Sequence, residues 1–162
     1  MCNLSRVALH EFQVSSVVPA SPAEVWARVS SIEGINHELM PLARMTCPRR
    51  FAAIDPAVVP LGERLFRSWI LLFGVLPVDY DDLTLVRVEP GRGFLETSRM
   101  LSQRRWVHER TLEAVPGGCR VTDRIGFEPR LAPAAGVFRR VFRLFFAHRH
   151  RRLGAFFARK DR

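Results

Sequence analysis

The segment WVHERTLEAVPGGCRVTDRIGF, residues 106–127, decides the fold because its two halves predict one antiparallel hairpin. Residues 115–118 (VPGG) are expected to form a four-residue turn, which places Ala114 opposite Cys119. Counting outward along both strands puts four more pairs on the same face of the hairpin. These pairs are Leu112 with Val121, Arg110 with Asp123, His108 with Ile125, and Trp106 with Phe127.

This register predicts two unlike faces. The second face pairs Glu113 with Arg120, Thr111 with Thr122, and Glu109 with Arg124. Directly opposed charges interact, so the complementary pairs favour this register and an exposed position for this face. The first face is mostly apolar but contains His108, Arg110 and Asp123. Because buried charges are costly unless paired, these residues form either a structural ion pair or the few polar anchors of an apolar pocket.

The rest of the chain predicts an α+β protein. Residues 10–18 alternate as a first strand, and Ser21, Pro22 and Glu24 have the pattern of a capping box with proline at the first helical position. A second short helix is expected over residues 35–42, ending near Pro41, followed by a loop over residues 46–61. Further strands are expected at residues 63–73, 80–89, 93–100, 106–115 and 119–127.

A long amphipathic helix is expected over residues 134–160, which contain no proline and repeat apolar residues at helical spacing. Its predicted buried face consists of Val137, Phe138, Val141, Phe142, Phe145, Leu153 and Phe156, with Arg139, Arg140, Arg143 and His150 opposite. A helix of this kind covers a sheet, so the outline is a curved antiparallel sheet wrapped around a helix.

Composition narrows the class of protein. A chain of 162 residues with 48% hydrophobic residues is enough for one domain with a real core. The longest apolar run, residues 69–78, is about half of a membrane span, and Arg6 and His10 interrupt any signal-peptide core, so a cytoplasmic protein is expected. Three cysteines without metal-binding spacing predict reduced thiols, and neither a metal site nor a cofactor motif is expected.

The positive charge is concentrated at the end of the chain. The formal net charge is +9, and residues 134–162 hold nine basic residues and one acid. A basic helix can attract nucleic acid or anionic lipid. A solvated helix face explains the same pattern, and no nucleic-acid partner is expected.

Four stretches resemble the SRPBCC superfamily when taken in order. They are FGVLPVDYDDL (73–83), GFLETSRM (93–100), the hairpin with Trp106, His108 and its Gly-Gly turn, and FFAHRHRRLGAFF (145–157). This superfamily has the helix-grip fold of START lipid-binding domains, birch-pollen-allergen-like proteins and polyketide cyclase/dehydrase-like proteins. The resemblance covers about residues 10–157 and implies one domain over residues 1–162.

The resemblance implies a deep cavity between the sheet and the long helix, which would hold a lipid-, sterol- or polyketide-like molecule. The candidate ligand-binding residues are Trp69, Trp106, His108, Arg110, Asp123, Phe127, Phe145 and His37. The two tryptophans are either cavity walls or ordinary core, and His37 lies either at the entrance or on a helix surface. The superfamily contains enzymes as well as binders, so fold does not settle function.

The alternative function is a polyketide cyclase/dehydratase-like enzyme. In that reading His108 is the acid–base group, with Arg110 and Asp123 as polar anchors. His148, Arg149 and Arg152 fall at the border of the apolar helix arc and reach either one end of the cavity or past the sheet edge. A homodimer partner could bury residues 69–78, but an internal strand explains that run equally well.

Overall fold

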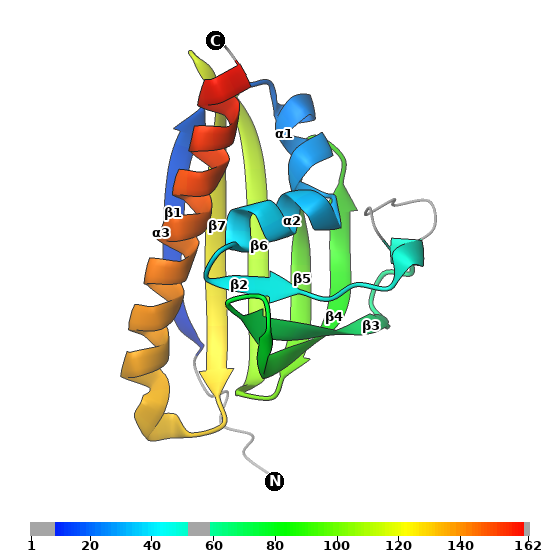
Figure 1. Ribbon diagram of the computed structural model, residues 1–162, viewed down its shortest axis with the longest axis vertical. Helices are drawn as coiled ribbons and strands as arrows, with labels where there is room; N and C mark the ends of the chain where they lie inside the picture. The colour runs from blue at the N-terminus through cyan, green and yellow to red at the C-terminus, as the bar shows by residue number, and fades with distance from the viewer. Residues whose placement is uncertain (1–8, 52–58, 161–162) are drawn as a thin grey trace, which may run out of the picture.

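The strands form one curved antiparallel sheet in the computed structural model, which describes residues 9–51 and 59–160 (Figure 1). The sheet has seven strands in the order β1-β7-β6-β5-β4-β3-β2. Their bounds are β1 His10–Val18, β2 Ala43–Met45, β3 Arg64–Leu72, β4 Leu76–Glu89, β5 Gly93–Met100, β6 Gln103–Val115 and β7 Gly118–Pro129. Cys2, Arg6 and part of the predicted loop, residues 52–58, lie outside the described residues.

Three α-helices pack on one side of this sheet. The helix α3, Ala135–Lys160, runs along β1 and β7, while α1, Pro22–Val29, and α2, Ile32–Leu39, lie in front of the sheet (Figure 1). Two short 3-10 turns, η1 Arg49–Phe51 and η2 Ala132–Ala134, complete the described elements. The order of one strand, two short helices, a run of strands and a long helix confirms the predicted α+β helix-grip fold.

The hairpin of β6 and β7 has the predicted register at every pair from Trp106–Phe127 to Ala114–Cys119. The turn is shorter than predicted, because Val115 also pairs with Gly118 and leaves a two-residue connection. Gly118 has φ 144°, and a Cβ there would lie 2.0 Å from the carbonyl oxygen of Val18 in β1. Glycine is therefore required at this position, where the neighbouring strand passes too closely for a side chain.

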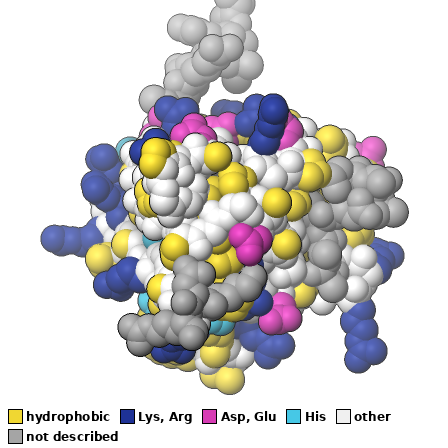
Figure 2. All heavy atoms as spheres, turned by 90° about the horizontal axis from the view of Figure 1, so that it is seen from above, with side chains coloured by type: hydrophobic (Ala, Val, Ile, Leu, Met, Phe, Trp, Pro, Cys, Tyr) yellow, Lys and Arg dark blue, Asp and Glu magenta, His cyan; other side chains and the backbone are white. Residues whose placement is uncertain are grey.

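The charged pairs of the hairpin lie on its outer face, as predicted. Arg120 lies 3.8 Å from Glu113, and Arg124 lies 4.0 Å from Glu109. Seen from above in Figure 2, Lys and Arg side chains project around the periphery of the molecule. Exposed ion pairs of this kind contribute little to stability, so the register depends mainly on the apolar inner face.

The local signals for helix ends agree with the structure at the start of α1 and at the end of α2 near Pro41, but not at the start of α2. At α1, Glu24 N–H donates to Ser21 Oγ at 3.3 Å and Ser21 N–H donates to Glu24 Oε2 at 3.0 Å, which confirms the capping box. The second helix, predicted over residues 35–42, spans Ile32–Leu39 and therefore lies three residues earlier in the chain. Ser31 caps α2 by accepting from Gly34 N–H at 3.0 Å, and the helix ends before the extended residue Met40. A residue that precedes proline disfavours the helical conformation, which ends α2 there.

Two strands begin earlier than predicted. The strand β4 begins at Leu76 and not at residue 80, because β3 shifts register between Ile70 and Leu71 and pairs Leu71 with Pro77. The strand β6 begins at Gln103. In a sequence, proline predicts the end of a strand. Only the structure shows that β3 continues to pair with β4 around Pro77.

The buried stripe of α3 differs from the predicted one. Phe146, His150, Leu153 and Phe157 are buried, so the prediction that His150 lies on the solvent side was wrong. Their spacing of three or four residues places them on one face of a helix. Val137, predicted to be buried, is 66% exposed, since at about 100° per residue it lies opposite Phe146.

This assignment of helix faces predicts the effect of two alanine substitutions in α3. Phe146 is 2% exposed and contacts the rings of Phe12 and His108, so Phe146→Ala should lower the free energy of unfolding by about 3–5 kcal/mol. The control Val137→Ala should change it by no more than about 0.5 kcal/mol. Urea unfolding monitored by circular dichroism measures both, and equal effects would contradict the assignment.

Candidate functional site

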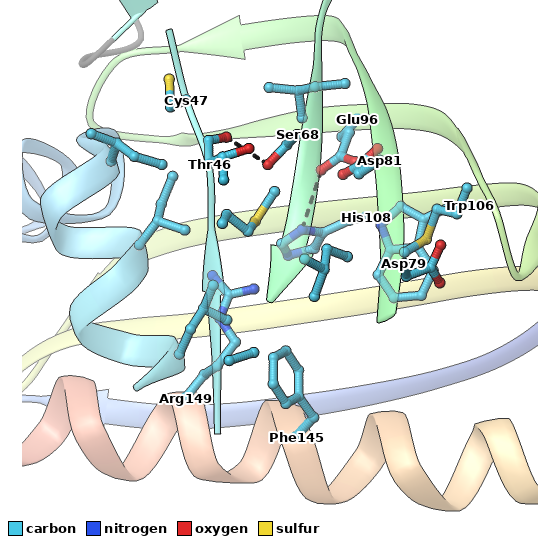
Figure 3. Close-up of a pocket in the computed structure, with 18 of the residues that line it drawn as sticks. Thr46, Cys47, Ser68, Asp79, Asp81, Glu96, Trp106, His108, Phe145 and Arg149 are labelled. Atoms are coloured by element: carbon cyan, nitrogen blue, oxygen red, sulfur yellow. Dashed lines mark hydrogen bonds and ion pairs between the residues drawn. The ribbon is translucent and has the colours of Figure 1, made fainter. Parts of the chain in front are cut away.

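A cavity of about 580 Å³ lies between the inner face of the curved sheet and the helices α2 and α3 (Figure 3). Its wall is mainly apolar. Representative lining residues are Leu39, Ile70, Leu85, Phe94, Trp106 and Phe145. These residues come from α2, four strands and α3, so the cavity exists only when the whole fold has formed.

A small polar patch interrupts the apolar wall on three neighbouring strands. Asp81 comes from β4, Glu96 from β5 and His108 from β6, and all three line the cavity. Glu96 and His108 are directly opposed across the β5–β6 pair, with His108 Nδ1 3.7 Å from Glu96 Oε2. Ser98 lies two residues along β5 and therefore faces the same side, where its hydroxyl donates to Glu96 Oε1 at 2.7 Å.

Behind this wall, Arg110 joins two buried carboxylates. Its Nε and Nη2 each donate to Asp123 at 2.7 Å, and its Nη1 and Nη2 donate to Glu38 at 2.9 and 3.0 Å. His108 Nε2 lies 2.9 Å from Asp123 Oδ1. The pairing of Arg110 and Asp123 follows from the hairpin register, whereas Glu38 reaches Arg110 from α2.

The long helix joins the same network through two consecutive residues. Arg149 Nε donates to Glu38 Oε2 at 3.0 Å, and His150 Nε2 lies 3.0 Å from Asp123 Oδ2. His150 Nδ1 is also 2.6 Å from Ser16 Oγ on β1. The network therefore connects α2, α3, β1, β6 and β7 behind the cavity.

The carboxyl groups of the site divide into two electrostatic classes. Burial raises the pKa of Asp123, but Arg110 and His108 outweigh it and hold this pKa well below its ordinary value. Burial likewise opposes ionisation of Glu38, while Arg110 and Arg149 bring its pKa below the ordinary value. Both groups are thus ionised partners of the network.

The pair of Asp81 and Glu96 shares its charge unequally. Burial raises the pKa of Asp81 well above its ordinary value, and the neighbouring Glu96 raises it further. Burial also raises the pKa of Glu96, but the interaction with His108 outweighs burial and leaves this pKa below its ordinary value. The pair favours a state in which Asp81 holds a proton and Glu96 is ionised.

The structure separates the predicted site residues into three groups. Trp106, His108 and Phe145 line the cavity. Arg110 and Asp123 lie behind it in the buried network. Other predicted residues lie elsewhere: Phe127 is fully buried beneath α3, with its ring centroid 5.2 Å from that of Phe142.

Two predicted residues lie away from the cavity. Trp69 is 44% exposed and packs against Tyr80 at 5.7 Å between ring centroids, because its neighbours Ser68 and Ile70 take the inward positions of the alternating strand. His37 packs against Phe156 at 5.4 Å, at the contact between α2 and α3. Both were predicted as ligand contacts, and neither side chain lines the cavity.

Sequence reasoning missed the places of Asp81 and Glu96 on the cavity wall and the pairing of Glu38 with Arg110. Asp81 lies within β4, inside the predicted strand 80–89, but the acidic residues around it give no sign of which side chain faces inward. Glu96 could have been found from the pairing of β5 with β6, which sets it opposite His108. Glu38 carries no sequence signal, since its partner Arg110 is 72 residues away.

Among the described residues, no three His, Cys, Asp or Glu side chains are placed to hold a metal ion. None of the described helices has the length and hydropathy of a membrane span.

Cys47 and Cys119 are free thiols, and burial raises the pKa of each. His148, at the cavity wall, lies 3.0 Å from the Met40 carbonyl oxygen.

Solved structures of other proteins share the fold. Protein CV1439 from Chromobacterium violaceum is similar at a TM-score of 0.67 and 14% identity, covering 91% of this chain and 96% of the other. The di-domain ARO/CYC StfQ from the steffimycin biosynthetic pathway is similar at 0.66 and 12%, covering 95% of this chain and 52% of the other. Ara h 8.0201 is similar at 0.56 and 14%, covering 90% and 98%. These likenesses show the helix-grip fold.

The sequence itself identifies a family. A family model with the description "Domain of unknown function (DUF8410)" matches residues 16–157, so the chain belongs to that family. None of the curated proteins compared by sequence matches this chain.

The network predicts that Glu38→Gln is strongly destabilising, because it leaves Arg110 and Arg149 without their shared carboxylate. The expected loss of free energy of unfolding at pH 7 is about 3–5 kcal/mol. The matched control is Glu33→Gln on the same helix, whose side chain is 85% exposed and pairs with Arg28; its expected loss is under about 1 kcal/mol.

The same variant has a defined pH dependence. The contribution of Glu38 is fully present above about pH 4, the ordinary carboxyl pKa, and is lost as the pH falls through the lowered pKa of the folded state. The difference between wild type and Glu38→Gln should therefore shrink below about pH 4. Urea unfolding at several pH values measures it, and a pH-independent difference would refute the ionised assignment.

Proposed function

We propose that this member of the DUF8410 family binds one small, largely apolar molecule, of lipid-, sterol- or polyketide-like character, in the cavity between the sheet and α3. The observation that carries the proposal is a cavity of about 580 Å³ with an apolar wall and one polar patch. Ligand pockets for small molecules have this size and this composition, with a few polar groups that fix orientation.

The lining residues would make different kinds of contact with the ligand. Trp106 offers a large apolar surface held in place by Phe142 and Phe146, at 5.1 and 6.2 Å between ring centroids. Phe145 contributes a second aromatic surface from α3. His108 supplies a polar contact. Asp123 acts as a positioning residue because it contacts His108 Nε2, and Arg110 in turn holds Asp123; neither of these two lines the cavity.

A second function, acid–base catalysis of the polyketide cyclase/dehydratase type, is supported by the placement of His108. Asp123 lies at its Nε2 and Glu96 near its Nδ1, so the ring has a fixed orientation on the cavity wall. An imidazole oriented by a carboxylate is suited to moving a proton on a bound substrate. The likeness to StfQ, an ARO/CYC protein, supports this candidate only through the shared fold.

The binding proposal predicts that the protein takes up 1-methylpyrene, an apolar fluorescent probe. Trp106→Ala should raise its Kd roughly five- to tenfold through loss of apolar contact. The control Trp69→Ala removes the same residue type outside the cavity and should leave Kd unchanged. Fluorescence titration gives Kd, and near-ultraviolet circular dichroism verifies packing; the same loss in both variants, or no uptake by wild type, would count against the proposal.

The catalytic candidate predicts a separate outcome. The protein would convert the small molecule that copurifies with it, and His108→Gln would lower kcat by roughly 100-fold or more while the Kd of that molecule changes little. Native mass spectrometry identifies the molecule and liquid chromatography follows its conversion. Conversion at the wild-type rate by His108→Gln would exclude His108 as the acid–base group.

A further inference from the structure

One buried oxygen on the cavity wall has no hydrogen-bond partner among the residues that the structure describes. Asp81 is 4% exposed and lines the cavity, and its Oδ1 accepts no hydrogen bond within the described part of the chain. Two other buried polar atoms there also lack partners, on Arg28 and Gln103, but neither residue lines the cavity. Since buried polar atoms are normally hydrogen-bonded, Asp81 Oδ1 points to a partner that arrives with a ligand.

The neighbouring carboxyl groups are already engaged. Glu96 Oε1 accepts from Ser98, and Glu96 Oε2 lies 3.7 Å from His108 Nδ1. Asp79, two residues before Asp81 on β4, accepts from the Ser102 hydroxyl and from the Tyr80 N–H, the latter at 2.8 Å. Asp81 Oδ1 is therefore the open acceptor in this patch, and Figure 3 shows Asp81 beside Glu96 on the cavity wall.

The carboxyl of Asp81 hydrogen-bonds with Glu96, so its proton belongs on the oxygen that faces Glu96 and Oδ1 is left as an acceptor. The group that completes the patch is then a hydrogen-bond donor, and the surroundings favour a neutral one. Burial and Glu96 raise the pKa of Asp81, so it holds its own proton and needs no cation as a partner. An ammonium would lose its hydration in an apolar space, which costs far more than burying a hydroxyl.

We propose that Asp81 Oδ1 is the recognition point for a hydroxyl group on an otherwise apolar ligand. The protein would then prefer an alcohol or phenol over a hydrocarbon of the same shape. The apolar wall holds the body of the ligand, and the patch of Asp81 and Glu96 orients its hydroxyl end. This inference rests on the proposed binding function, because the recognition point operates only when the cavity holds a ligand.

The test compares three probes that share one aromatic body: 1-methylpyrene, 1-pyrenemethanol and 1-pyrenemethylamine. Their Kd values are measured by fluorescence titration for wild type and three variants. Asp81→Leu removes the acceptor, and Asp81→Asn keeps a carbonyl oxygen in nearly the same place. Asp82→Asn is the matched control, since this next residue pairs on the outer face with Arg67, at 2.8 and 3.0 Å.

The informative quantity is the Kd of 1-methylpyrene divided by the Kd of 1-pyrenemethanol. One net hydrogen bond should make this ratio roughly three- to tenfold larger in wild type than in Asp81→Leu. Asp81→Asn and Asp82→Asn should keep the wild-type ratio, and Asp81→Asn retains a polar side chain even if Asp81→Leu fails to fold.

Three outcomes would overturn the inference. An unchanged ratio in Asp81→Leu would show that Asp81 does not select the hydroxyl, while uptake of 1-methylpyrene would leave the binding function standing. If Asp81→Asn loses the preference for 1-pyrenemethanol over 1-methylpyrene, and wild type binds 1-pyrenemethylamine most tightly of the three probes, the patch recognises a cation and not a hydroxyl. Failure of all three probes to bind wild type would overturn the binding function as well.

Discussion

The geometry of this protein depends on the Arg110 guanidinium and the two buried carboxylates that it joins. Arg110 is 1% exposed and forms paired hydrogen bonds with Asp123 and with Glu38. Removing such charges from water is costly, and the cost is offset only when every charge has a well-placed partner. The two carboxylates in turn hold Arg149 and His150, so α2, α3 and the hairpin have one relative position that satisfies the whole group.

The cavity is a consequence of that arrangement. The network lies behind the wall, where it fixes the layers, and the space in front remains lined mainly by apolar side chains. His108 belongs to both regions, because one ring nitrogen contacts Asp123 while the residue lines the cavity. The structural and the functional interpretations of the inner hairpin face are therefore compatible: Arg110 and Asp123 are structural, and Asp123 orients His108, which lines the cavity.

Two buried aspartates show how environment separates chemical roles. Cationic partners hold the pKa of Asp123 well below its ordinary value, whereas burial beside Glu96 raises the pKa of Asp81 well above it. Two groups of one residue type whose pKa values are driven apart by their environments differ in protonation state and can therefore take different chemical roles. Here the ionised aspartate stabilises the fold and the protonated one faces the cavity.

The sequence by itself determined the elements whose signals are local: the capping box at Ser21, the hairpin register with Arg110 opposite Asp123, and the helix-grip order of strands and helices. It predicted Trp106 and His108 on the inner face, because strand alternation is a short-range rule. Only the tertiary structure decided that Trp69 faces outward, that Glu38 completes the network, and that α3 turns His150 inward. Such contacts join residues that are distant in sequence, and the cost of burying a charge is offset by whichever partner the assembled layers bring within reach, which no local pattern encodes.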